Sequence, residues 1–141
     1  MSPSNAATLD RLWLAAVEAG KNAYAPYSRF YVGAALLFED GRIVTGCNVE
    51  NVSYGLTSCA ERNALFRAIS ERGAGSRIVA VAVANRNGAA SPPCGACRQV
   101  MSEFVTPDAV VRFAGAKGPE TVRFAELFPF GFSFKPQEGA Q

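Results

Sequence analysis

Residues 59–84 read CAERNALFRAISERGAGSRIVAVAVA and join two segments of different character. The first, residues 59–72, has the composition of a good helix, and Gly73 after it is a typical helix stop. The second, residues 78–84, is a continuous run of Val, Ile and Ala, which is typical of a strand buried on both faces. A helix that leads into such a strand indicates an α/β fold.

Before this stretch, the sequence predicts one helix and one hairpin. Apolar residues recur at helical spacing between positions 9 and 20, and Thr8 or Asn5 is suited to cap that helix. Residues 31–38 are apolar and of strand length, and residues 43–49 are consistent with a returning strand. An Asp-Gly pair between the two segments is a typical hairpin turn.

After the stretch, the pattern of helix and strand continues. Pro93 suits the first position of a helix that runs to about Phe104. Residues 109–114 predict another strand, residues 120–128 a short helix, and residues 135–141 a polar, flexible tail. Strands that alternate with helices favour an α/β sandwich with a mixed sheet.

The composition is that of an ordinary globular protein, with 49% hydrophobic and 18% charged residues, so residues 1–141 are expected to form a single domain. The net charge of +2 is too small to suggest a phosphate-backbone binder, and no nucleic-acid partner is expected. No apolar run approaches the roughly 20 residues of a membrane span. Met1–Asn5 lacks the features of a signal peptide. We therefore expect a cytoplasmic protein without a membrane partner.

The sequence contains no histidine. This excludes Ser-His-Asp and Cys-His nucleophilic catalysis, and every metal site with a histidine ligand. The chain does contain four cysteines, Cys47, Cys59, Cys94 and Cys97. Without a secretion signal, they are better explained by metal or redox chemistry than by disulfides.

Three of the cysteines stand at predicted helix starts, in Cys59-Ala60-Glu61 and in the CxxC pair of Cys94 and Cys97. The positive end of a helix dipole favours a deprotonated sulfur. A catalytic zinc takes three protein ligands and leaves its fourth position to water. These three cysteines can supply the ligands, and Glu61 would then lie beside the open position without binding the metal.

Two other interpretations of the cysteines stay open. Cys47 could complete a four-sulfur site, which would make the chain a non-catalytic, structural zinc-binding module. Cys94 and Cys97 alone would suit a thioredoxin-like redox pair, although this leaves the Cys-Ala-Glu triplet unexplained. Glu61 by itself would be an ordinary carboxylate at a helix start.

Four motifs occur together in this chain: YSRFYVGAAL at 27–36, NVEN at 48–51, CAE at 59–61 and PCGAC at 93–97. On the basis of these motifs, nearly the whole chain after the first helix resembles the small zinc-dependent cytidine deaminases. The members it resembles are tetramers in which all the protein ligands of the zinc are cysteines. The resemblance implies a three-layer α/β/α sandwich with a mixed central sheet of about five strands.

The resemblance also implies the chemistry, which is hydrolytic deamination of cytidine and deoxycytidine to uridine and deoxyuridine, with release of ammonia, in pyrimidine salvage. Cys59, Cys94 and Cys97 would hold one Zn²⁺ per subunit, and a zinc-activated hydroxide would attack the cytosine ring while Glu61 shuttles protons. Arg62 matches the family arginine that hydrogen-bonds a ligand sulfur and so offsets the negative charge of three thiolates.

Substrate-binding residues follow from the same resemblance. Asn48 and Glu50 match the residues that bind the ribose, and Phe30 matches the aromatic that packs against the pyrimidine. The backbone of Ala60 matches the position at which the main chain of family members contacts the amide group of the base.

The implied assembly is a homotetramer that binds a small nucleoside. Tyr54 and Phe132 match positions that help complete a neighbouring subunit's pocket. Tyr31 stands where many family members have proline, and a larger side chain there is expected to reshape the pocket rim. A deaminase of a modified or antibiotic cytosine nucleoside, which would share the zinc core, is a second possibility. Nucleic-acid editing is disfavoured by the small net charge.

Overall fold

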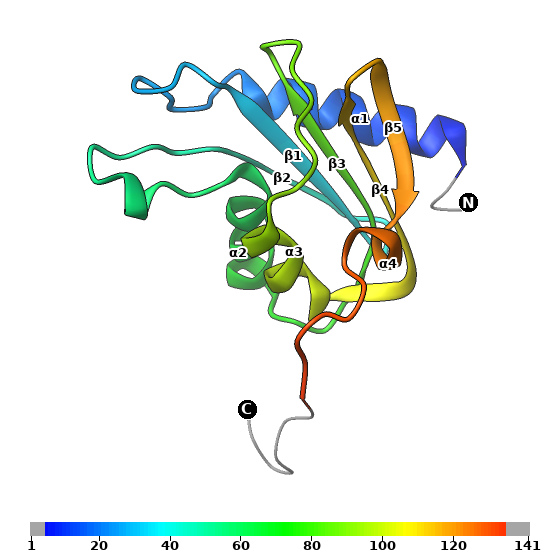
Figure 1. The fold of residues 1–141 in the computed structure, drawn as a ribbon. Coiled ribbons are helices and arrows are strands. Elements are labelled where there is room, and N and C mark those ends of the chain that lie inside the picture. Colours follow the sequence, from blue (N-terminus) through cyan, green and yellow to red (C-terminus); the bar gives the residue numbers. More distant parts are fainter. Residues whose placement is uncertain (1–4, 135–141) are drawn as a thin grey trace.

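The computed structural model describes residues 5–134, and these residues form one five-stranded sheet with helices on both faces (Figure 1). The strands are β1 (Val32–Phe38), β2 (Ile43–Cys47), β3 (Ile78–Asn85), β4 (Val105–Gly115) and β5 (Gly118–Arg123). The helices are α1 (Ala6–Gly20), α2 (Ala60–Arg72), α3 (Gly95–Ser102), α4 (Phe124–Leu127) and the 3₁₀ turn η1 (Tyr54–Leu56). The strand order is β2-β1-β3-β4-β5, and only β3 and β4 run parallel among these neighbours. The sheet is therefore mixed, as predicted.

The central strands are buried on both faces because helices cover each side of the sheet (Figure 1). In β3, Val81 and Val83 pack into the cluster that includes α2 and α3, whereas Ala80 and Ala82 pack into the cluster that includes α1. This alternation follows the two-residue period of a strand. The continuous apolar run thus builds the middle layer of an α/β/α sandwich, and that prediction is confirmed.

Helix α1 lies very close to the sheet because Gly33 in β1 has no side chain. A Cβ atom built at Gly33 would lie 1.9 Å from the carbonyl oxygen of Ala16 and 2.9 Å from the Cα of Gly20. Both neighbours belong to the backbone of α1, so they cannot rotate away. Glycine at position 33 is therefore what allows α1 to contact the sheet.

We expect Gly33→Ala to lower the free energy of unfolding by about 3 kcal/mol, because the helix must move away from the strand and reopen the packing between them. Urea unfolding followed by circular dichroism measures this loss. Gly55→Ala is the matched control, because nothing lies within 4 Å of a Cβ there. Equal stability of the two variants would contradict the close approach.

The prediction of a helix over residues 120–128 is wrong in its first half. Residues 120–123 belong to β5, which pairs antiparallel with β4 from Gly118 to Arg123, and only the four residues of α4 are helical. Gly118 has a φ of 125°, a backbone conformation that glycine tolerates and that lets the chain reverse after Gly115. The strand forms because β4 offers it a free edge, which is a tertiary effect.

Two other predicted boundaries need correction. The third helix begins at Gly95 and not at Pro93, because Cys94 is an extended N-cap with φ −68° and ψ 165°. The strand predicted at 109–114 is longer and begins at Val105. At the first helix, Asn5 is the cap, and its side-chain oxygen accepts hydrogen bonds from the amides of Ala7 and Thr8.

Residues 135–141, for which a flexible tail was predicted, lie outside the described residues. Within residues 5–134, no helix has the length and apolar character needed to span a membrane.

Candidate metal and substrate site

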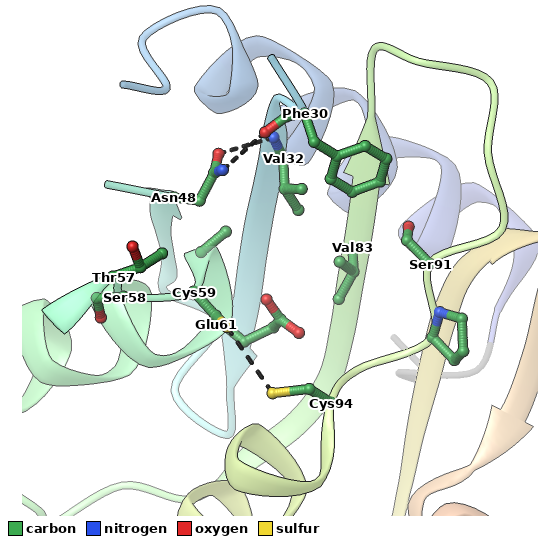
Figure 2. Close-up of a pocket in the computed structure, with 12 residues that line it drawn as sticks. Phe30, Val32, Asn48, Thr57, Ser58, Cys59, Glu61, Val83, Ser91 and Cys94 are labelled. Carbon is green, nitrogen blue, oxygen red and sulfur yellow. Dashed lines mark hydrogen bonds between the residues drawn. The ribbon is translucent and has the colours of Figure 1, made fainter. Parts of the chain in front are cut away.

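The starts of α2 and α3 converge on one point, where Cys59 and Cys94 face each other (Figure 2), and Cys97 completes a cluster of three cysteines. Cys59 and Cys94 are the N-caps of these helices, and both are extended, with φ/ψ of −73°/153° and −68°/165°. Cys97 lies in the first turn of α3 and is buried. The three sulfurs lie within 4.8 Å of one another, and those of Cys59 and Cys94 are 3.8 Å apart.

This sulfur cluster fits a zinc ion. Tetrahedral zinc with Zn–S bonds of about 2.3 Å places its sulfurs about 3.8 Å apart, which is the separation of the Cys59 and Cys94 sulfurs. None of the four cysteines is in a disulfide bond. In the part of the chain that the structure describes, this is the one group of Cys, Asp and Glu side chains arranged to hold a metal, and Cys47 does not belong to it. A four-sulfur site closed by Cys47 therefore has no support.

The charge of the sulfurs is balanced by Arg62. Its Nη2 donates to the Cys59 sulfur at 3.3 Å, and this contact raises the pKa of the guanidinium. A hydrogen bond with Cys97, assisted by Arg62, lowers the pKa of the Cys59 thiol to about 5 against the opposing effect of burial. The same hydrogen bond raises the pKa of Cys97. These contacts favour the thiolate form of Cys59, which is the form that binds a metal.

Glu61 is a buried acid beside this cluster. Its side chain is 4% exposed and extends into the pocket (Figure 2). Burial raises the pKa of Glu61 to about 7, and the neighbouring Cys59 charge acts in the same direction. A carboxyl group with a pKa near neutrality can both accept and release a proton, which suits a general acid-base catalyst.

The pocket itself has a volume of about 190 Å³ (Figure 2). It lies between the sheet and the two cysteine turns, which are the start of α2 at Cys59 and the start of α3 at Cys94. Phe30, Val32 and Val83 give it apolar walls, Asn48 lies at one end, and Glu61 lies toward the sulfurs. A small, mostly apolar cavity with a few polar groups is typical of a small-molecule site.

Six of the predicted site residues meet in this pocket, Cys97 and Arg62 belong to the sulfur cluster beside it, and three others lie elsewhere. The pocket is lined by Phe30, Asn48, Cys59, Ala60, Glu61 and Cys94. Glu50 and Tyr54 instead line an adjacent cavity of about 320 Å³, which shares Thr57 with the first. Phe132 lies against α3, where its carbonyl oxygen accepts a hydrogen bond from Gln99.

Asn48 and Glu50 hold the segment between α1 and β1. The Asn48 side chain accepts from the amide of Val32 at 2.9 Å and donates to the carbonyl of Phe30 at 2.8 Å (Figure 2). The Glu50 carboxylate accepts from the amides of Tyr27 and Ser28 and from the Ser28 hydroxyl, which lowers the pKa of Glu50. Both side chains therefore fix the loop that carries Phe30.

We expect this arrangement to give a defined pH dependence of stability. Because the pKa of folded Glu50 is lowered, its contribution is complete above the usual glutamate pKa of about 4.3 and is lost as the pH falls through the lower folded-state value. The melting temperature of native protein minus that of Glu50→Gln should be constant above about pH 5 and shrink below about pH 4. Glu71→Gln, in an exposed pair with Arg67, is the control. A difference that stays constant down to about pH 3 would contradict this role.

Several pocket residues were not found by sequence reasoning. Ser58 and Pro92 each lie next to a cysteine motif, and that adjacency was a usable signal. Val83 gave no such signal, because in the sequence it is one of many strand residues. Tyr31 is not among the residues that line the pocket. The Arg86 guanidinium lies 5.3 Å from the centroid of the Tyr31 ring, and the Tyr31 amide donates to the side-chain oxygen of Asn87. The expected reshaping of the rim by Tyr31 has no support.

Comparison with known proteins shows which family this chain belongs to. Residues 7–113 match the family model described as the cytidine and deoxycytidylate deaminase zinc-binding region. The chain belongs to the cytidine and deoxycytidylate deaminase family. It is 50% identical over 120 residues to the cytidine deaminase of Halalkalibacterium halodurans, an alignment that covers 84% of this chain and 89% of the relative.

Solved structures of cytidine deaminases share the fold. The crystal structure from Mycobacterium tuberculosis matches with a TM-score of 0.77 and 43% identity, covering 89% of this chain and 98% of the other. The structure from Burkholderia pseudomallei matches with a TM-score of 0.77 and 44% identity, covering 87% and 98%. The cofactor of this deaminase is zinc, as the family model and the sulfur cluster together indicate.

Proposed function

We propose that this chain, as a single domain of residues 1–141, deaminates cytidine and deoxycytidine to uridine and deoxyuridine in cytoplasmic pyrimidine salvage. The observation that carries the proposal is the buried Glu61 carboxyl, which extends into a mostly apolar pocket beside three clustered cysteine sulfurs. This combination supplies an acid-base group and a metal site in one small cavity. The 50% identity to a named cytidine deaminase supports the same substrate.

Cys59, Cys94 and Cys97 would hold one zinc ion per subunit. When bound, zinc supplies Lewis acidity that lowers the pKa of a coordinated water. The chain contributes the surroundings. Arg62 donates to the Cys59 sulfur and offsets its charge, and the N-terminal ends of α2 and α3 add the positive ends of two helix dipoles.

Glu61 would move the protons of the reaction. Its carboxylate accepts one proton from the attacking water and delivers it to N3 of the cytosine ring, so that C4 is open to addition of the oxygen. The same carboxyl then takes the second proton of that water and passes it to the amino group on C4. The C4–N bond breaks, ammonia leaves, and the C4 carbonyl of uridine forms. No net proton is gained or lost by Glu61.

Substrate placement would rest on residues at the other end of the pocket. Phe30 would pack against the pyrimidine ring, and the backbone of Ala60 would meet the base amide. Asn48 has one side-chain N–H and one oxygen lone pair beyond its bonds to Phe30 and Val32, and these can bind the ribose. Glu50 would contact the ribose from the adjacent cavity.

The pocket would be completed by neighbouring copies in a homotetramer. Tyr54 and Phe132 are 75% and 70% exposed, and Val52 and Phe130 are exposed beside them in the sequence. The loop that carries Tyr54 extends away from the sheet (Figure 1). Large apolar side chains that gather on protruding segments are typical of protein interfaces.

The direct test is purified protein incubated with cytidine and deoxycytidine, with ammonia release followed in the presence and absence of a chelator. We expect turnover that the chelator removes and added zinc restores. A parallel panel of base- and sugar-modified cytosine nucleosides separates the proposal from its alternative. Faster turnover of a modified nucleoside than of either natural one would replace the proposed substrate.

A further inference from the structure

The two cysteine turns share a feature that the reaction does not use. In each helix, the side chain four residues after the N-cap cysteine reaches back to the residue before that cysteine. In α2 this is Asn63, whose Oδ1 accepts from the Ser58 hydroxyl at 2.7 Å. In α3 it is Arg98, whose Nε donates to the Pro93 carbonyl at 2.7 Å.

Each of these side chains also binds a second, distant segment. Asn63 Nδ2 donates to the carbonyl of Cys47 at 2.8 Å, at the end of β2 and next to Asn48. Arg98 Nη1 donates to the carbonyl of Leu127 at 2.7 Å, at the end of α4. Asn63 therefore connects the Cys59 turn to the end of β2 beside Asn48, and Arg98 connects the Cys94 turn to the end of α4.

The cysteine turns need such support because the cysteines do not cap their own helices. Neither Cys59 nor Cys94 makes a side-chain hydrogen bond to its helix N-terminus, whereas Ser, Thr, Asp or Asn at an N-cap usually does. A sulfur directed at a metal is not available for capping. The direction of its Cα–Cβ bond then depends on how firmly the preceding backbone is held.

We propose that Asn63 and Arg98 are paired positioning residues that hold the Cys59 and Cys94 turns in the geometry that binds zinc. Neither residue contacts the metal position as a ligand. Asn63 holds both the hydroxyl and the carbonyl of Ser58, and Arg98 holds the carbonyl of Pro93. This inference rests on the proposed ligand set of Cys59, Cys94 and Cys97.

The test measures zinc affinity by competition with EDTA and compares Arg98→Met and Asn63→Leu with native protein. We expect each variant to bind zinc about ten-fold more weakly, since the loss of groups that orient metal ligands has effects of this size. Arg98→Lys, which can reach one carbonyl but not both, should give an intermediate value. If Arg98→Met fails to fold, the zinc affinity of Arg98→Lys provides the test instead.

Two controls remove comparable bonds elsewhere. Arg77→Met removes a donor to the Glu103 carbonyl at the opposite end of α3, and Asn87→Leu removes an amide that binds the backbone of Arg29 and Tyr31. Both should retain native zinc affinity. The absorption of cobalt(II)-substituted protein gives a second readout, because sulfur-to-cobalt bands report ligand geometry, which a loss of general stability does not change.

Native zinc affinity and cobalt spectra in both Arg98→Met and Asn63→Leu would overturn the inference. So would a loss of affinity in the two controls equal to that in the test variants, because the effect would then be general destabilisation. Cys94→Ala distinguishes an incorrect set of zinc ligands from an incorrect positioning role of Asn63 and Arg98. If it keeps zinc, the ligand set is wrong and the inference falls with it. If it loses zinc while the positioning variants do not, only the inference fails.

Discussion

Glu61→Gln should lower kcat for cytidine by about 10²–10⁴-fold, because positioned acid-base groups contribute rate enhancements of that size. Glutamine has nearly the shape of glutamate but cannot accept and return a proton. The side chain is 4% exposed, and a neutral amide is no harder to bury than a carboxyl group. Folding and zinc binding should therefore persist. Steady-state ammonia release, zinc content per chain and the melting temperature together measure the prediction.

The comparison variant for this result is Glu126→Gln, which changes a carboxylate in the short helix α4, away from the residues that line the pocket. It should retain the native rate. A Glu61→Gln protein that keeps full zinc and more than about a tenth of the native kcat would refute the proton-transfer role, because general acid-base catalysis contributes far more than this. A Glu61→Gln protein that loses zinc would instead indicate that Glu61 supports the metal site.

The local placement of Cys59, Cys94 and Cys97 at helix starts could be predicted because each motif carries its own local structure. Cys59 and Cys94 both precede residues that favour a helix, and both became N-caps. Cys97 follows Cys94 by less than one helical turn, so its sulfur falls on the same side of α3. These relations depend on spacing along the chain, and spacing is visible in the sequence. Family resemblance then supplied the remaining site residues.

Other parts could not be predicted because pairing and packing contacts, and not the local pattern of residues, decide them. Residues 120–123 form a strand only because β4 pairs with them. Asn63 has no local sign of its role, since its acceptor on Cys47 is brought close by the packing of α2 on the sheet. Likewise, nothing near Glu50 in the sequence indicates its hydrogen bonds to Tyr27 and Ser28, which lie 23 and 22 positions before it. In each case a tertiary contact decides the structure.

Cys94→Ala should remove both zinc and activity. The substitution leaves Cys59 and Cys97 as the two remaining sulfurs of the cluster, and two ligands cannot complete the three-ligand site that a catalytic zinc requires. We expect zinc content to fall from about one per chain to nearly none after dialysis, and turnover to fall to background. Cys94 is exposed, so its loss should cost little packing energy, and circular dichroism should show a folded protein.

Cys47→Ala is the matched cysteine variant, because Cys47 lies outside the cluster and its carbonyl, not its sulfur, is bound by Asn63. It should keep zinc and activity. The pair of variants distinguishes an enzyme site with an open position from a structural site closed by four sulfurs. Zinc loss in Cys47→Ala, or full zinc in Cys94→Ala, would favour the structural site or a different ligand set. If Cys47→Ala keeps zinc and Cys94→Ala loses it, the fourth ligand position of the zinc is left to water. A water molecule in that position is the source of the protons that Glu61 would transfer.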